Sequence, residues 1–326
     1  MPTRWWIGCS RTSRPRPSVP TSDGTRTGVA SARGSFLIPV VEATTVNRET
    51  ILVVGATGTQ GGAVARHLLE RDVQVLALTR NTTKHESHQL VEQGGTLVEG
   101  NIAERNTIEP LLEDADGVFL VTNFWEHGYD DEVEQGTNVV ELAAEGGIDH
   151  LVFSSVGGAE RNTGISHFES KWEIEQRLAD LELPTTVVRP VFFAQNLEGF
   201  RDSIEDGTLA MGLEPRSPLQ ILDIEDLGAF VAEVFANPDR YLSEAYELAS
   251  DELPLRAMAA RFADELGIDV RAQHLSIDEV ESSQGEEFAD MFAWFNEHGY
   301  DSPIDDLRAD HDVPFNRFET YLERAW

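Results

Sequence analysis

The sequence predicts an α/β protein built on a doubly wound parallel sheet, with a smaller, mainly helical α/β lobe after it. Two observations lead to this prediction. From residue 51 to residue 189, short apolar runs rich in Val, Leu and Ile alternate with stretches of helical composition, and this order favours right-handed βαβ units in one parallel sheet. The first apolar run also ends in a glycine cluster that leads directly into a helical stretch, as in nucleotide-binding α/β folds.

The predicted elements follow one another at short spacings. We expect strands at 51–55, 73–79, 96–99, 117–122, 149–154 and 184–189. We expect helices at 60–70, about 85–93, about 104–112, about 131–146 and about 167–181. Ligands in such sheets bind beyond the carboxyl ends of the strands, at the point where the strand order reverses. The residues just after each strand are therefore the candidates for function.

Three glycines after the first strand, Gly55, Gly58 and Gly61, keep the spacing G-x-x-G-x-x-G. Glycine lets the backbone turn sharply, lets a pyrophosphate approach, and lets the new helix pack closely against its strand. The amino end of that helix offers unpaired N–H groups and the positive end of a dipole to a phosphate. We therefore predict a dinucleotide site formed by Gly55, Thr57, Gly58, Thr59, Gln60 and Gly61.

Arg80 follows the second strand, where NAD-binding folds of this kind carry an Asp or Glu for the ribose 2′-hydroxyl. A guanidinium can donate two hydrogen bonds to a 2′-phosphate, so Arg80 favours NADP over NAD. Lys84 is expected to add a second positive charge. The alternative interpretation of Arg80 is a solvated loop arginine.

Residues after the third and fourth strands complete the predicted dinucleotide site. Asn101 is expected beside the adenine. Thr122, Asn123 and Phe124 are expected along the wall near the nicotinamide half. The sequence leaves two interpretations of Phe124 and Trp125 open, a stacking wall and core aromatics.

The remaining candidates follow the fifth strand. Ser154 and Ser155 end that strand, and His167 and Lys171 open the next helix. Residues four apart share one helix face, which we expect to face the strand ends.

Lysine occurs only at positions 84 and 171, and the other 23 basic residues are arginine. An ammonium group with a shiftable pKa suits ribose binding or proton transfer, and arginine cannot replace it in the latter. The alternative is a surface lysine.

Charge is the strongest compositional signal. The chain has 58 acidic and 25 basic residues, which gives a net charge of −33. Molar salt would shorten the Debye length to about 3 Å and screen this repulsion, so we interpret the protein as halophilic, with a cytoplasmic location. The strong apolar periodicity and the dispersed carboxylates argue against a disordered acidic protein.

Three other classes of partner are not expected. Direct nucleic-acid binding needs Lys and Arg to neutralise phosphates, and this chain is acidic. No run approaches the roughly 20 apolar residues of a membrane span. His85 and His88 have the spacing of a ligand pair, but no carboxylate or cysteine motif accompanies them, so we interpret them as exposed helix histidines and predict no metal site.

Residues 1–47 differ in composition from the rest of the chain. They contain six arginines and two acids and are rich in Pro, Ser, Thr and Gly without a sustained period. We expect a disordered extension, with a misassigned start as the preferred explanation and the protein proper beginning near Val46. The apolar run 36–41 is too short for a signal peptide. Cys9, the single cysteine, lies in this extension, so disulfides are not expected.

Several stretches of the chain, taken together, match the pattern of a known family. They are Gly55–Gly61, Val121–Trp125, Gln135–Asn138, Val152–Ser155, His167-Phe168-x-x-Lys171, Val188–Phe193 with Asn196, and Ile221–Gly228. With them, the chain resembles the NmrA-like branch of the atypical short-chain dehydrogenases/reductases over about 48–326. The resemblance implies a Rossmann lobe at 48–190 that prefers NADP and a smaller lobe at 191–326 that closes the cleft. Helices near 193–206, 224–236, 254–266, 285–298 and 315–326 would form much of the second lobe.

The resemblance also implies roles for the pair at positions 167 and 171. In reductase members of the larger superfamily, a Tyr-x-x-x-Lys pair does the chemistry. Its lysine holds the nicotinamide ribose and lowers the pKa of the tyrosine that protonates the substrate. His167 stands at the tyrosine position here. Some NmrA-like proteins lack this tyrosine and serve as nucleotide-responsive regulators that bind other proteins, while others in the wider group reduce quinones or activated double bonds.

Two hypotheses follow. The first is an NADP(H)-binding regulator with a protein partner and weak or no turnover. The second is an NADPH-dependent reductase of small quinones or enones, in which Lys171 or His167 protonates the product and Ser154 or Ser155 orients the substrate oxygen. A third class, sugar-nucleotide epimerisation, shares the fold but normally relies on the missing tyrosine.

Overall fold

The computed structural model describes residues 49–326. The expectations for residues 1–47, which are the disordered extension, the misassigned start and the position of Cys9, lie outside the described residues. Within the described range, every helix is too short or too polar to span a bilayer.

The largest element is a seven-stranded sheet that confirms the predicted fold class. Its strands are β1 (Thr50–Val53), β2 (Gln74–Thr79), β3 (Thr96–Glu99), β4 (Gly117–Val121), β5 (His150–Ser154), β6 (Thr185–Pro190) and β10 (Ala245–Leu248). They lie in the order β10-β6-β5-β4-β1-β2-β3, and every neighbouring pair is parallel. The order reverses between β1 and β4, so the carboxyl ends of these two strands form the topological switch point.

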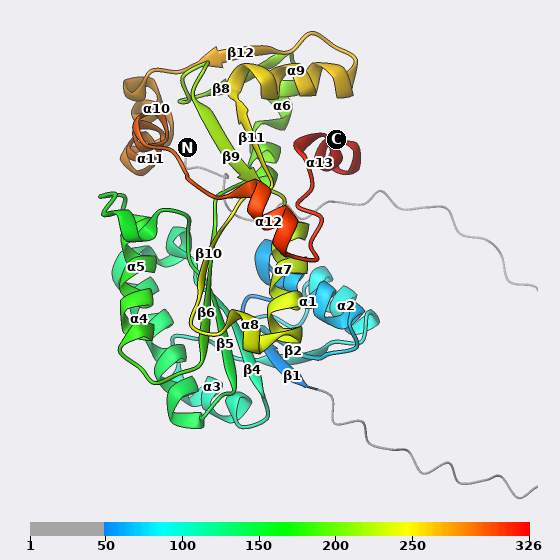
Figure 1. Ribbon diagram of the computed structural model, residues 1–326, viewed down its shortest axis with the longest axis vertical. Helices are drawn as coiled ribbons and strands as arrows, with labels where there is room; N and C mark the ends of the chain where they lie inside the picture. The colour runs from blue at the N-terminus through cyan, green and yellow to red at the C-terminus, as the bar shows by residue number, and fades with distance from the viewer. Residues whose placement is uncertain (1–48) are drawn as a thin grey trace, which may run out of the picture. The chain divides into compact units, whose positions relative to one another are not determined.

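Helices cover both faces of this sheet. They are α1 (Thr59–Glu70), α2 (His85–Glu92), α3 (Arg105–Leu112), α4 (Phe124–Gly146), α5 (Ser166–Ala179), α7 (Ile224–Ala236) and α8 (Pro238–Tyr241). Figure 1 shows α3, α4 and α5 on one side of the strands and α1, α2 and α7 on the other. Helices on both faces are the arrangement expected for a doubly wound parallel sheet.

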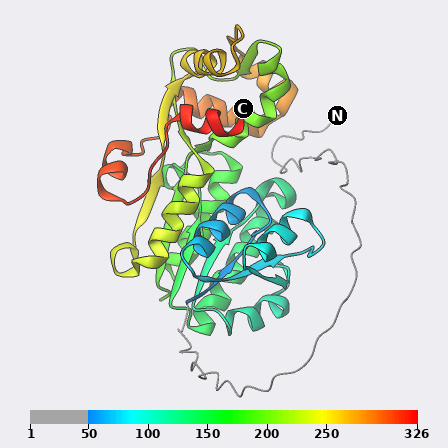
Figure 2. The same ribbon diagram turned by 90° about the vertical axis from the view of Figure 1, so that its right-hand side faces the viewer.

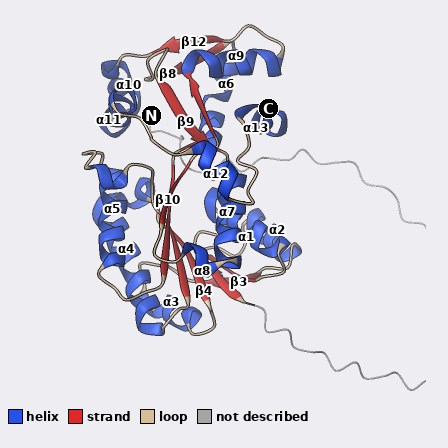
Figure 3. Ribbon diagram, in the orientation of Figure 1, coloured by secondary structure: helices blue, strands red, loops and turns tan. Residues whose placement is uncertain are grey.

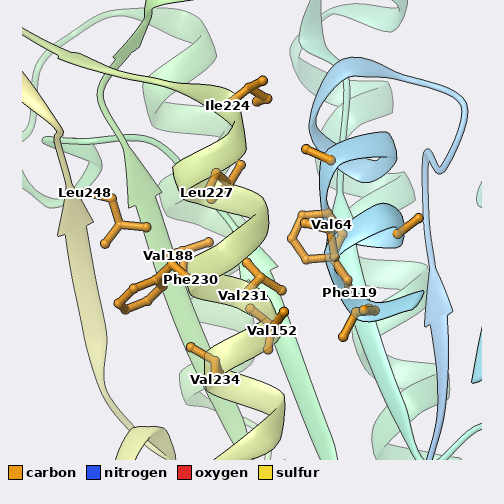
Figure 4. Close-up of a cluster of buried hydrophobic side chains, with 14 of the residues drawn as sticks. Val64, Phe119, Val152, Val188, Ile224, Leu227, Phe230, Val231, Val234 and Leu248 are labelled. Atoms are coloured by element: carbon orange, nitrogen blue, oxygen red, sulfur yellow. The ribbon is translucent and has the colours of Figure 1, made fainter. Parts of the chain in front are cut away.

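Alternation along β1 explains this double cover. Ile51 and Val53 belong to the apolar cluster that also contains residues of α1 and α7, whereas Leu52 and Val54 belong to a second cluster with residues of α3, α4 and α5. Successive side chains of a strand point to opposite faces, so an unbroken apolar run must be covered on both sides. The first cluster is drawn in Figure 4, where side chains of α7 such as Val231 lie against the sheet.

The predicted elements of the large sheet agree with the structure to within one or two residues, with one exception. The helix expected at 131–146 begins at Phe124. Gly128 has φ 78° and ψ −175°, a conformation that interrupts the helix after its first turn. Glycine tolerates a positive φ that other residues avoid. The first turn, 124–127, is therefore a separate piece that lies over the strand ends.

The remaining chain combines short strands with helices. Its strands are β7 (Phe192–Phe193), β8 (Thr208–Met211), β9 (Pro218–Leu222), β11 (Asp251–Pro254) and β12 (Arg271–His274). Its helices are α6 (Arg201–Glu205), α9 (Leu255–Leu266), α10 (Ile277–Gln284), α11 (Glu286–Glu297), α12 (Ile304–Asp310) and α13 (Phe318–Ala325). Figure 3 shows helices and two small sheets mixed in this region. The helix expected at 193–206 is instead a 3-10 segment at Ala194–Phe200 followed by α6.

Two elements after residue 190 return to the large sheet. β10 adds its seventh strand beside β6, and α7 packs on α1 (Figure 2). Gly228 permits this close approach, because a Cβ there would lie 2.8 Å from the Ala63 carbonyl oxygen. The division of the chain into lobes at 48–190 and 191–326 stays a prediction. A helix at 224–236 was expected, but the sequence did not indicate that α7 packs on α1 or that β10 joins the large sheet.

Candidate functional site

The glycine turn lies at the switch point, between β1 and α1. Gly55 has φ +68°, and its carbonyl oxygen accepts a hydrogen bond of 2.8 Å from the Gly58 N–H. A Cβ on Gly61 would lie 2.4 Å from the Gly55 carbonyl oxygen and 2.8 Å from that of Val54. Backbone atoms cannot yield by that much, so position 61 requires glycine for α1 to pack against the end of β1.

The amino end of α1 is open. Its N-cap is Gly58, and no side chain caps the helix. Gly55, Gly58 and Thr59 are exposed, whereas Thr57 and Gln60 are half-buried. The first turn of a helix has N–H groups without intrahelical partners, and the dipole makes this end positive. The turn can therefore receive a phosphate group, which is the function predicted for it.

Arg80, just after β2, forms an ion pair that the sequence did not indicate. Its Nη2 lies 2.7 Å from Oε2 of Glu126, in the first turn of α4. The two side chains are 53% and 43% exposed, so this is a surface pair. The hydrogen bond from Arg80 holds the pKa of Glu126 below its usual value, and the nearby charges of His127 and Lys84 act in the same direction. The 2′-phosphate role of Arg80 and Lys84 stays a prediction.

The residues predicted to contact the adenine and the nicotinamide half of the dinucleotide differ in their accessibility. The Asn101 side chain accepts a hydrogen bond of 3.2 Å from the Ala103 N–H, which closes a turn before α3. Thr122 is buried, whereas Asn123 is exposed and Phe124 is half-buried. The hydroxyl of Thr122 is already hydrogen-bonded to other side chains of the protein. Asn123 is therefore the most accessible of these predicted residues.

Lys171 is held by a buried network. Its Nζ donates to the Thr122 carbonyl oxygen at 3.0 Å, to Thr122 Oγ1 at 2.6 Å and to Oε1 of Glu132 at 2.7 Å. Ser170 donates to the other oxygen of Glu132. Glu132 is completely buried, and the Lys171 side chain is 12% exposed. Burial raises the pKa of Glu132, but the charge and hydrogen bonds of Lys171 outweigh it and hold that pKa below the usual value.

His167 faces an acidic partner from the second half of the chain. Its Nδ1 lies 2.5 Å from Oε1 of Glu287, and its backbone N–H donates to the same oxygen at 2.8 Å. Glu287 belongs to α11. Burial raises the pKa of Glu287, and the hydrogen bonds from His167 overcome this and lower it. The histidine and carboxylate thus form an oriented pair.

Aromatic rings surround this pair. The Trp125 ring centroid lies 5.0 Å from that of His167 and 4.8 Å from that of Phe288, on which it stacks. Phe124 lies 5.7 Å from His167. The two aromatic residues that the sequence left ambiguous therefore link the end of β4 to α11, and both remain half-buried. Their function as a wall for a ligand stays a prediction.

The two serines after β5 differ in their partners. Ser154 Oγ donates to Oε1 of Gln60 at 2.7 Å, which ties the end of β5 to the glycine turn. Ser155 is buried, and its Oγ has no hydrogen-bond partner within the described chain. A buried hydroxyl without a partner is costly and points to an absent ligand or water.

The structure thus brings most predicted residues to one edge of the sheet and adds three carboxylates. Glu126, Glu132 and Glu287 are the partners of Arg80, Lys171 and His167. Among residues 49–326, no group of three or more His, Cys, Asp and Glu is arranged to hold a metal ion.

A glycine turn at the switch point of a doubly wound parallel sheet, with an open helix terminus beside it, defines a Rossmann-type α/β protein. The pattern of the NmrA-like family matches residues 47–322. The chain belongs to this family, which confirms the predicted resemblance. A similar protein is an NmrA-like family domain-containing protein of Dictyostelium discoideum, 28% identical over 294 residues that cover 84% of this chain and 97% of the relative.

Solved structures with the same fold include proteins of two kinds. An NADPH-dependent quinone oxidoreductase from Escherichia coli, complexed with NADPH, has a TM-score of 0.73 and 20% identity over 84% of this chain and 98% of its own. NmrA, a negative transcriptional regulator in complex with NAD, has a TM-score of 0.70 and 19% identity over 85% of this chain and 95% of its own. At such identities the likeness concerns the fold alone.

Proposed function

We propose that this protein binds NADP(H) at the glycine turn and acts as a nucleotide-responsive regulator with weak or no turnover. Two observations support the binding half. The amino end of α1 beside the glycine turn has no side-chain cap and can receive a phosphate group, and Arg80 follows β2, where a guanidinium would favour a 2′-phosphate. The exposed Asn123 and the unpaired Ser155 hydroxyl are further groups able to receive the dinucleotide. The NADP-binding quinone oxidoreductase and the NAD-binding regulator share this fold.

The hydrogen bonds of Lys171 support the proposal that turnover is weak or absent. An ammonium group has three N–H donors, and three acceptors lie within 3.0 Å of Nζ. One of them is a carboxylate oxygen of the completely buried Glu132. A proton donor must release its proton and turn to its substrate. Lys171 would have to break these hydrogen bonds to do either, so the network disfavours proton transfer from Lys171.

The second candidate, an NADPH-dependent reductase of quinones or activated double bonds, is favoured by the His167–Glu287 pair. Bound NADPH would supply the hydride. A carboxylate on Nδ1 fixes the orientation of the ring, which leaves Nε2 as the ring atom that could hold a proton for a substrate oxygen. Burial beneath Trp125 and Phe124 would limit the access of water. Ser155, with its unpaired hydroxyl, could orient the same oxygen.

Calorimetric titration of the full chain with NADP+, NADPH, NAD+ and NADH tests the proposal. We expect similar affinities for the two NADP forms and weaker binding of the NAD forms. A parallel assay follows NADPH absorbance with a panel of small quinones and enones. Steady consumption of NADPH that Lys171→Ala and His167→Ala abolish, while thermal unfolding shows both variants to be folded, would refute the regulator and support the reductase. Turnover unaffected by either substitution would refute the roles proposed for both residues.

The acidic composition leads to a related proposal. We infer that the protein is adapted to a cytoplasm of high salt, because the self-repulsion of a net charge of −33 is reduced where salt screens it. Residues 191–326 would form the lobe that closes over the dinucleotide, and the contacts of α11 with His167 and Trp125 support this arrangement.

A further inference from the structure

The ion pair between Arg80 and Glu126 crosses the glycine turn. β1 lies between β4 and β2 in the sheet, and its carboxyl end is the glycine turn. Arg80 follows β2 on one side of that turn, and Glu126, the third residue of α4, follows β4 on the other side. Their contact of 2.7 Å therefore bridges the two walls between which a dinucleotide would enter.

Glu126 is presented by a short, well-held segment. The first turn of α4, residues 124–127, is separated from the rest of the helix by the break at Gly128. Trp125 anchors this turn by stacking on Phe288. The turn is thus fixed to the nicotinamide side of the site while its carboxylate reaches the residue expected to bind the adenosine ribose.

The chemistry of the ribose 2′ position makes this carboxylate significant. In dinucleotide-binding sheets, an Asp or Glu at the end of the second strand accepts a hydrogen bond from the 2′-hydroxyl of NAD, whereas an arginine there accommodates the 2′-phosphate of NADP. Here Arg80 occupies that position, and a glutamate lies within one hydrogen bond of it. The site contains both groups, each supplied by a different wall.

We propose that Glu126 is a specificity-determining residue, which accepts the 2′-hydroxyl of NAD(H) and opposes the 2′-phosphate of NADP(H) by holding Arg80. This inference rests on the proposed function, since it concerns the same dinucleotide site. NADP(H) binds only when Glu126 releases Arg80, and its phosphate then repels the freed carboxylate. NAD(H) needs no such release. Glu126 therefore lowers the ratio of NADP(H) affinity to NAD(H) affinity below the value that Arg80 alone would give.

The exposure of the pair sets the size of the effect. Both side chains are about half exposed, and exposed ion pairs are weak because water and salt screen them. Breaking such a pair lowers affinity by at most about fivefold. We therefore expect Glu126→Gln to raise the affinity for NADP+ by about fivefold and to lower that for NAD+ by about twofold, a change of about tenfold in their ratio.

Glu145→Gln is the matched control. Glu145 lies near the other end of α4, is 64% exposed, and pairs with Arg105 at 3.1 Å. The substitution removes the same charge from the same helix at a distance from the glycine turn. It should leave the NADP+ to NAD+ ratio unchanged, which separates a local effect from a change in net charge.

The experiment titrates the full chain and both variants with NADP+ and NAD+ at about 0.2 M and 2 M KCl, with thermal unfolding to verify that each variant is folded. The Debye length is about 7 Å in the first buffer and 2 Å in the second, so the effect of Glu126→Gln should shrink in the second. A ratio unchanged by Glu126→Gln, or shifted equally by Glu145→Gln, would overturn this inference while leaving the proposed function intact. If no dinucleotide binds any of the three proteins, both the inference and the proposed function are wrong.

Discussion

Replacing Lys171 by methionine tests the buried network around Glu132. Methionine keeps much of the side-chain volume but has no charge and no donors. It would leave Glu132, which is completely buried, without its positive partner, and only the hydroxyls of Thr122 and Ser170 would remain. An uncompensated buried charge is among the most costly defects in a folded protein. We expect Lys171→Met to lower the free energy of unfolding by about 3 to 5 kcal/mol at pH 7.

The pH dependence of the free energy of unfolding tests whether the buried charge of Glu132 causes this loss. In the native protein the pKa of Glu132 lies below its usual value of 4.5, so the ionised pair stabilises the fold above about pH 4.5 and this stabilisation is lost as the pH falls through the folded pKa. In Lys171→Met, only the hydroxyls of Thr122 and Ser170 oppose the effect of burial, so the pKa of the carboxyl rises above that in the native protein. The loss in free energy of unfolding of Lys171→Met relative to the native chain should be largest at pH 7. It should become smaller toward pH 5, as Glu132 takes up a proton.

Urea unfolding followed by tryptophan fluorescence measures this free energy at constant salt. Lys84→Met is the control, because Lys84 is the other lysine and is exposed. It should change the free energy of unfolding by less than about 0.5 kcal/mol. A loss below about 1 kcal/mol in Lys171→Met, or a loss that is constant from pH 5 to pH 7, would refute the reasoning.

Three other predictions concern features elsewhere in the same structure. Gly61→Ala should abolish dinucleotide binding in calorimetry, because its Cβ would meet the Gly55 carbonyl oxygen, whereas Gly146→Ala, which meets nothing within 4 Å, should bind normally. Burial, reinforced by the charge of Asp223, raises the pKa of Asp226 to about 7, so native stability falls as the pH rises from about 4 to 7. Asp226→Asn should therefore gain about 2 kcal/mol relative to the native chain between pH 5.5 and pH 8 in urea titrations, and an equal response of both proteins would contradict this. The melting temperature should rise steadily from 0.2 M to 2 M KCl if screening of the net charge stabilises the fold, and a flat profile would count against a halophilic protein.

The large sheet could be predicted because its strands are marked locally. Each of the first six contains at least two consecutive Val, Leu, Ile or Phe residues and is bounded by helix-forming or turn residues. β10 was missed because Ala245–Leu248 contains no two consecutive residues of this kind. The early start of α4 was missed because Gly128 interrupts the helical pattern. Tertiary packing against β6, rather than local pattern, places β10.

The site could be predicted for the residues that follow the strands but not for their partners. Glu126 lies 46 residues from Arg80, and Glu132 lies 39 residues from Lys171. Both are ordinary helix carboxylates in a chain with 58 acids, and no local pattern distinguishes a buried glutamate from a solvated one. Glu287 lies 120 residues from His167. Pairs across such separations are set by how the elements pack, which the sequence alone does not reveal.

The return of the chain to its large sheet limits how the protein can be divided. β10 supplies the seventh strand only after the chain has formed β7, β8 and β9, and it covers the edge of β6. A fragment that ends near residue 190 would leave that edge unpaired, and an open strand edge invites aggregation. Chimaeras that exchange the last third of the chain between relatives should therefore keep α7 and β10 with the amino-terminal parent. Ribosomal synthesis faces the same constraint, since the sheet is incomplete until residue 248 has emerged.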